Sequence, residues 1–157
     1  KNLARQEPRP PKGKESNMIG AFDISTSGLV AQRIRLNAIS SNLANMSTVV
    51  NENGEAQPYQ ARYPIFETND NVATPYGASG VKVASIEIEN SEPRYKYQPN
   101  HPLAIKEGPK KGFVAYPNIN MINEFTDALE ATRAYEANIG VIEATKAMGN
   151  QSLQIIA

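Results

Sequence analysis

The sequence predicts an α+β fold, with long N- and C-terminal helices paired as an antiparallel coiled coil and a small β and loop region between them. Both ends of the 157-residue chain repeat apolar residues at alternating steps of three and four, the spacing of a coiled-coil seam. Residues 50 to 117 contain eight of the eleven prolines and six of the seven tyrosines, a composition typical of strands and loops. Because the middle returns the chain between two helices that each need a seam partner, we expect the helices to pair with each other.

The expected organisation has four parts: an extension over residues 1–17, a helix over 18–49, a β and loop region over 50–117 and a helix over 118–157. The extension has three prolines, five basic residues and almost nothing apolar. Such a composition cannot bury enough surface to offset the entropy of ordering, so it predicts a disordered or extended segment. A second interpretation stays open, in which Met18 is the native start and the preceding residues are a remnant.

The first helix is predicted from a seam in which Ser25 and Gln32 are the polar members. We expect Gly28 to place a bend or a late helix start, with fraying before Leu29, because glycine costs about 1 kcal/mol relative to alanine in a helix. The helix should end near Asn45, where turn-forming residues follow. Its expected assembly contacts are Phe22, Leu29, Leu36, Ile39, Leu43 and Met46.

The middle region predicts three or four short strands in one small sheet. Residues 59–66 form the first candidate, interrupted at Pro64. Residues 81–89 form the second, and a change of phase in their alternation predicts a bulge at Ala84 and Ser85. A short run between glycine and proline reads as a last strand that ends at Tyr116.

The last helix is predicted from a proline-free stretch with Asn118 or Asn120 as its N-cap and Glu124 and Asp127 early, where carboxylates favour the helix dipole. At 1.5 Å per residue it would be roughly 55 Å long, too long for a domain of this size to cover. Its expected assembly contacts are Met121, Phe125, Ala128, Tyr135, Ile139, Ile142, Leu153 and Ile156.

A two-helix hairpin leaves other apolar residues uncovered, which predicts an assembly around each hairpin. They lie outside both seams. They are Ile24, Val30, Ile34, Ile122, Leu129, Val141 and Ile155.

The composition predicts no enzyme chemistry. Sixteen basic and sixteen acidic residues give a net charge of zero, which argues against nucleic acid as a partner. The absence of cysteine excludes disulfides and thiolate metal sites. His101, the one histidine, lies in a turn, and the run Gly108 to Gly112 lacks the order of a phosphate loop. We therefore expect no catalytic residue, metal, cofactor or small-molecule substrate.

No apolar run approaches the length of about eighteen residues that a membrane span needs. The N-terminal residues show no charged stretch followed by an apolar one, so no Sec-type signal is expected.

Short motifs at both ends resemble those of the bacterial flagellar rod and hook proteins. The N-terminal motif is ISTSGL from Ile24, followed by SNLAN from Ser41. The C-terminal one is YPNIN from Tyr116, followed by ATRAYEAN from Ala131. The likeness covers Met18 to the C-terminus, and the short middle region favours a proximal rod subunit over the longer distal rod and hook proteins.

The resemblance implies a structural subunit that polymerises into a helical tube, which transmits torque and encloses the export channel. Implied partners are copies of the chain, other rod subunits, the membrane-embedded base with its MS ring and export gate, and the surrounding P ring. The implied location is the periplasm-spanning rod, reached through the flagellar type III apparatus without a cleaved signal. The alternatives are a coiled-coil adaptor, which would close as a dimer, and another flagellar axial subunit.

Overall fold

The computed structural model describes residues 14–74 and 77–156. Along the sequence, one long helix comes first, four strands follow, and a second long helix comes last. The elements are α1 (Lys14–Ala44), β1 (Arg62–Ala73), β2 (Ser79–Ile88), β3 (Arg94–Tyr97), β4 (Phe113–Tyr116) and α2 (Met121–Ile156). The α+β class is confirmed. The expectation of one small sheet is wrong, because β1 pairs with β2 and β3 pairs with β4 in two separate antiparallel sheets.

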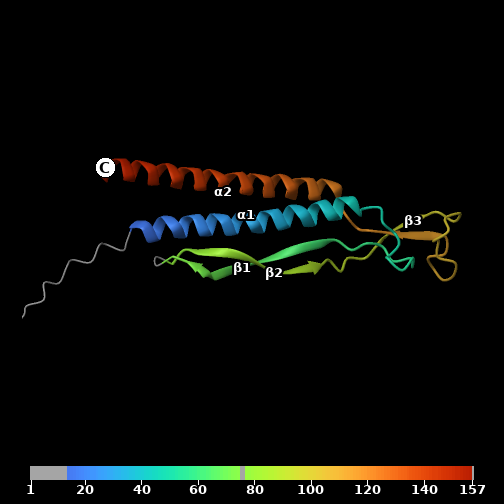
Figure 1. Cartoon of the computed structure of the whole chain (residues 1–157). Coiled ribbons are helices and arrows are strands. Elements are labelled where there is room, and N and C mark those ends of the chain that lie inside the picture. Colours follow the sequence, from blue (N-terminus) through green and yellow to red (C-terminus); the bar gives the residue numbers. More distant parts are fainter. Residues whose placement is uncertain (1–13, 75–76, 157) are drawn as a thin grey trace, which may run out of the picture.

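Helix α1 is the middle layer of the molecule. Helix α2 lies along one side of it and runs in the opposite direction, while the β1–β2 hairpin lies along the other side (Figure 1). Among the described elements, α2 contacts α1 and no strand. The β3–β4 sheet lies beyond the end of α1 that leads into the loop (Figure 1).

Helix α1 is continuous over 31 residues and passes through Gly28 without a break. The expected late start at Gly28 and the expected fraying before Leu29 are therefore wrong. A Cβ atom at Gly28 would lie 2.9 Å from Nδ2 of Asn138, so the missing side chain makes room for α2, and this tertiary contact outweighs the low helix propensity of glycine. The helix starts four residues before the expected boundary at residue 18, and residues 1–13 of the expected extension lie outside the described chain.

Helix α1 ends where the sequence predicted. After Ala44, the Asn45 side chain donates a hydrogen bond to the carbonyl of Ser41 at 2.9 Å and accepts one from the Thr48 hydroxyl at 3.1 Å. These bonds satisfy a helical carbonyl and turn the chain away from the helix.

Helix α2 begins after Asn120, one of the two predicted caps. The Asn120 side-chain oxygen accepts a hydrogen bond from the backbone N–H of Ile122 at 3.0 Å, and its carbonyl accepts one from Glu124 at 3.1 Å. Both bonds are those of an N-cap residue.

The β1–β2 hairpin carries the predicted bulge. Ile65 lies opposite Ser85 and the next residue, Phe66, lies opposite Val83, which leaves Ala84 without a partner. Strand β1 is longer than expected and Pro64 does not interrupt it. The Glu89 N–H donates to the Ala61 carbonyl, so by alternation the backbone of residue 64 faces the free edge of the sheet, where proline is tolerated.

The hairpin lies close to α1 at Ser27. The Ser27 hydroxyl accepts a hydrogen bond from the N–H of Val81 at 3.0 Å and donates one to the carbonyl of Ile24 at 2.6 Å. A Cβ atom at Gly80 would lie 2.8 Å from the Ser27 oxygen, so glycine allows this approach. Strand β2 is thereby fixed to the middle of α1.

The β3–β4 sheet has a small apolar centre of its own. Val114 is 1% exposed, and the rings of Tyr97 and Phe113 meet edge to face with centroids 5.2 Å apart. Backbone hydrogen bonds from Ile105 to Phe113 and from Gly112 to Ile105, both 2.9 Å, close the loop between the two strands.

Candidate assembly surface

The contact between α1 and α2 is built from small and polar residues. Ala131 of α2 is fully buried and Ala31 of α1 is 2% exposed. Asp127 and Ala134 of α2 are half-buried, and the eight other buried or half-buried positions described on this helix alternate in steps of four and three, which is the spacing of one helix face. They are Glu124, Ala128, Ala131, Tyr135, Asn138, Ile142, Thr145 and Gly149.

This stripe overlaps only part of the seam predicted for α2. Ala128, Tyr135 and Ile142 belong to both. The larger apolar members lie exposed, with exposed fractions of 43% for Met121, 54% for Phe125, 37% for Ile139 and 68% for Leu153, and the side chain of Ile156 lies outside the described part. On α1, Ile39 is buried, while Phe22, Leu29, Leu36 and Leu43 are half-buried. Met46 is also half-buried, but it lies in the turn after the helix. That all these residues form the assembly interface stays a prediction.

Two successive turns of α2 expose three large apolar side chains together. Ile122, Phe125 and Leu129 follow each other at steps of three and four, so they share a face of the helix. Their exposed fractions are 75%, 54% and 62%. We call these three residues the α2 apolar stripe. A contiguous apolar surface of this kind marks an interaction site.

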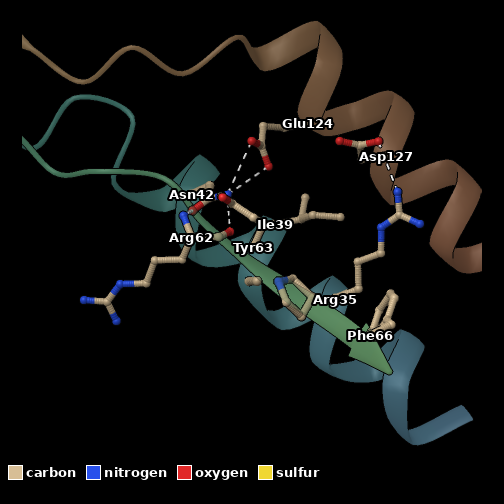
Figure 2. A pocket seen from close by; sticks show the side chains of 10 residues that line it. Arg35, Ile39, Asn42, Arg62, Tyr63, Phe66, Glu124 and Asp127 are labelled. Carbon is tan, nitrogen blue, oxygen red and sulfur yellow. Dashed lines mark hydrogen bonds and ion pairs between the residues drawn. The ribbon is translucent and has the colours of Figure 1, made fainter. Parts of the chain in front are cut away.

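A polar junction joins three elements near this stripe (Figure 2). Figure 2 shows three of its members: Asn42 on α1, Arg62 at the start of β1 and Glu124 on α2. The fourth is Tyr59, which lies in the loop before β1. Asn42 is 4% exposed, and its amide nitrogen donates to the Arg62 carbonyl at 3.0 Å and to both carboxylate oxygens of Glu124 at 3.3 Å. Its oxygen accepts from the Arg62 N–H at 2.9 Å and from the Tyr59 hydroxyl at 3.1 Å.

Burial raises the pKa of Glu124 above its ordinary value. The hydrogen bond from Asn42 acts in the opposite direction, and the negative charges of Asp127 and Glu89 add to the increase. The helix pair thus holds a carboxylate in a place that disfavours its charge.

Arg35 links the two helices one turn further along. Its guanidinium nitrogen lies 3.2 Å from Asp127 and 3.0 Å from Glu130, and its side chain is a quarter exposed (Figure 2 shows Arg35 and Asp127). The two ion pairs of Arg35 therefore favour one axial position of α2 relative to α1.

Sequence reasoning missed the polar junction and the Arg35 contact. One signal was available: an asparagine such as Asn42, inside an otherwise regular helix, competes with the helix for backbone hydrogen bonds and is unfavourable unless it has a specific partner.

Residues 14–74 and 77–156 offer neither a metal site nor a membrane span. No group of three histidine or acidic side chains there could hold a metal ion, and neither helix there is apolar over a length that could cross a membrane. The ring nitrogen Nδ1 of His101 accepts a hydrogen bond from the N–H of Leu103 at 3.2 Å, as in an ordinary turn.

Known protein families match both ends of the chain. Residues 22–49 match the family described as "Flagella basal body rod protein", and residues 110–155 match the one described as "Flagellar basal body rod FlgEFG protein C-terminal". The first match covers most of α1 and the second covers β4 and α2.

Individual relatives cover nearly the whole chain. The flagellar basal-body rod protein FlgC of Borreliella burgdorferi is 38% identical over 152 residues, which cover 88% of this chain and 97% of the relative. FlgC of Escherichia coli O6:H1 is 39% identical over 140 residues with the same coverage. FlgC of Bacillus subtilis is 35% identical over 147 residues, covering 86% of this chain and 95% of the relative.

The relatives, together with the matches at both termini, define the class as flagellar basal-body rod proteins. Within this class the chain belongs to the FlgC family. It is a structural subunit of the flagellar basal body that assembles with other rod components, which confirms the function expected from the resemblance.

Proposed function

We propose that this chain polymerises with copies of itself and with other rod subunits into the helical tube of the proximal rod, which transmits torque and encloses the export channel. The observation that carries the proposal is the α2 apolar stripe. Ile122, Phe125 and Leu129 are all more than half exposed on a helix that has one neighbour in the described chain. Leaving this surface in water is unfavourable, so neighbouring subunits would cover it.

In this proposal the terminal helices pair as an antiparallel coiled coil that lines the tube, and the β region lies outside. The buried small residues Ala131 of α2 and Ala31 of α1 support close helix packing. The contacts of Asn42 with Glu124 and of Arg35 with Asp127 support a fixed register for the pair.

The finer location and partners follow from the family likeness. We place the subunit in the periplasm-spanning part of the rod, next to the MS ring and export gate of the membrane-embedded base, with the P ring as a surrounding partner. Export would proceed through the flagellar type III apparatus without a cleaved signal.

The alternative functions are a coiled-coil adaptor and a different axial subunit. A closed dimer would bury the α2 apolar stripe against its own copy, whereas a rod subunit needs contacts that do not close. The relatives argue against a different axial subunit, because FlgC of Borreliella burgdorferi is covered over 97% of its length.

The test replaces Leu129 by aspartate. Leu129 is 62% exposed, so the variant should fold with unchanged helix content by circular dichroism. Burying an unpaired carboxylate in an interface costs several kcal/mol, so we expect the variant to be lost from purified basal bodies and the cells to be non-motile. The matched control is Asn123→Asp, which adds the same charge at an exposed position of the same helix and should be incorporated. Incorporation of Leu129→Asp at the wild-type level would refute the proposal.

A further inference from the structure

Charge is unevenly distributed along the β region, although the chain as a whole is neutral. From Glu52 to Glu92 the chain has seven acidic and two basic residues, and from Arg94 to Lys111 it has five basic residues and one acidic. All of these side chains are exposed. Among the ion pairs of the described residues, only the one between Lys82 and Glu67, at 3.4 Å, uses any of them. We call these two stretches the acidic surface and the basic surface. Most of their charged side chains form no ion pair within the described chain.

Each surface contains an exposed strand with alternating side chains. The end of β2 reads Ile86-Glu87-Ile88 and continues with Glu89, and β3 reads Arg-Tyr-Lys-Tyr over Arg94–Tyr97. All eight residues are exposed, including Ile86 at 56% and Ile88 at 53%. One strand alternates apolar and acidic residues, while the other alternates basic and aromatic ones.

Within residues 14–74 and 77–156 each of the two sheets has two strands, so β2 and β3 each have an edge without a strand neighbour, here called the free edge. On β2, the Glu89 N–H donates to the Ala61 carbonyl of the hairpin. Backbone groups alternate in direction along a strand, so those of residues 86 and 88 face the free edge. On β3, the Gln98 N–H donates to the Gly112 carbonyl, so those of residues 95 and 97 face the free edge.

We propose that β3 of one copy pairs antiparallel with the end of β2 of a neighbouring copy. Tyr95 would lie opposite Ile88 and Tyr97 opposite Ile86, as hydrogen-bonded pairs, because these are the residues whose backbone groups are free. The same register places Arg94 opposite Glu89 and Lys96 opposite Glu87 on the other face. Backbone direction, apolar contacts and charge pairs thus all select one register.

This inference rests on the proposed function and names a contact between neighbouring subunits. The β1–β2 hairpin lies along α1, whereas β3 and β4 lie beyond the end of the helices (Figure 1). We place the two contacts of each copy on different neighbours, with β3 on one and β2 on another. Such a contact is heterologous, the kind that can build a helical polymer. Exposed apolar edge strands attract pairing with other chains, and here the charges would restrict that pairing to one partner.

The first test is disulfide cross-linking in assembled basal bodies. The chain has no cysteine, so Lys96→Cys and Glu87→Cys introduce the only thiols. The two variants are expressed together with different tags, so that a disulfide carrying both tags joins two copies. Directly opposed residues bring their Cβ atoms to about 5 Å, close enough for a disulfide after a small adjustment. The matched control replaces Lys96→Cys by Lys106→Cys, an exposed lysine outside the strand.

We expect a disulfide-linked dimer with both tags from Lys96→Cys with Glu87→Cys. The control, Lys106→Cys with Glu87→Cys, should give only background cross-linking. If the tagged chains enter basal bodies and the two pairs cross-link equally, the strand pairing is wrong while the proposed function stands. If the Lys96→Cys variant links to a different protein, a second copy is not the occupant and the proposal is also wrong. If the wild-type chain is absent from basal bodies, the proposed function itself fails, and the strand pairing fails with it.

The second test reverses the charges. Lys96→Glu or Glu87→Lys alone should weaken association about tenfold, since a charge pair worth up to about 1 kcal/mol becomes a repulsion. The double variant restores opposite charges at every contact and should regain most of the yield of incorporated subunits. The control double variant, Lys106→Glu combined with Glu87→Lys, should not regain this yield. Equal yields from both double variants would overturn the proposed register.

Discussion

The side chain of Asn42 forms hydrogen bonds with both backbone polar groups of Arg62. The N–H of Arg62 donates to Asn42 Oδ1 at 2.9 Å, and Asn42 Nδ2 donates to the Arg62 carbonyl at 3.0 Å. The same side chain reaches Glu124 on α2. Three elements that are distant in sequence therefore meet at one almost fully buried amide.

Replacing Asn42 by alanine should lower the free energy of unfolding by about 2–3 kcal/mol, because the backbone of Arg62, the Tyr59 hydroxyl and the Glu124 carboxylate would all lose a hydrogen-bond partner. Chemical denaturation of the purified full-length chain measures this. Asn37, which is exposed on the same helix, provides the control: Asn37→Ala should change stability by less than about 0.5 kcal/mol. Similar losses for both variants would show that helix propensity, and not the junction, sets the cost.

Glu124→Gln should stabilise the chain at neutral pH. The pKa of Glu124 is raised in the folded chain above the ordinary 4.5, so the folded state binds the proton more tightly than the unfolded state. The protonated form therefore adds stability that is present below pH 4.5 and is lost as the pH rises through the higher folded pKa. Glutamine is neutral throughout and can still accept the hydrogen bond from Asn42. Denaturation of both chains across pH 3 to 8 should show a difference at neutral pH that disappears in acid, and a difference independent of pH would contradict this cause.

Gly28→Leu should push the two helices apart. The new side chain would meet the Asn138 amide, which is fixed by a 2.9 Å hydrogen bond to the Ala134 carbonyl. Overpacking of this kind costs about 1–3 kcal/mol. Gly140→Leu is the control, because nothing lies within 4 Å of a Cβ atom built there. We expect Asn138→Ala to restore part of the stability of Gly28→Leu, and no recovery would mean that the two residues do not compete for the same space.

Arg35→Ala should have a small effect that depends on salt. The partly exposed pairs with Asp127 and Glu130 contribute about 0.2–1 kcal/mol each at most. The loss, measured by thermal unfolding, should be largest at low ionic strength and should shrink in 1 M salt, where screening acts over about 3 Å. A loss that is unchanged by salt would indicate packing by the arginine stem instead of charge.

The sequence predicted the helices, the Asn120 cap and the bulge at Ala84 because each depends on residues close together in the chain. It did not predict that the strands form two sheets, since strand pairing depends on long-range contacts. The seam on α2 was predicted only in part. Apolar spacing alone cannot separate the face that packs within the chain from the face left for other subunits. In this protein the inner face uses small residues such as Ala131, and the larger Phe125 and Leu129 remain outside.

The position of α1 between the hairpin and α2 sets an order in which the chain can fold. Its contact with β2 at Ser27 and Val81 spans 54 residues, whereas its contact with α2 at Asn42 and Glu124 spans 82. The longer loop costs more entropy to close, and α2 is synthesised last. A growing chain can thus dock the hairpin on α1 while the final helix is still missing. That helix then adds to a surface already formed, and shortening it should spare the hairpin.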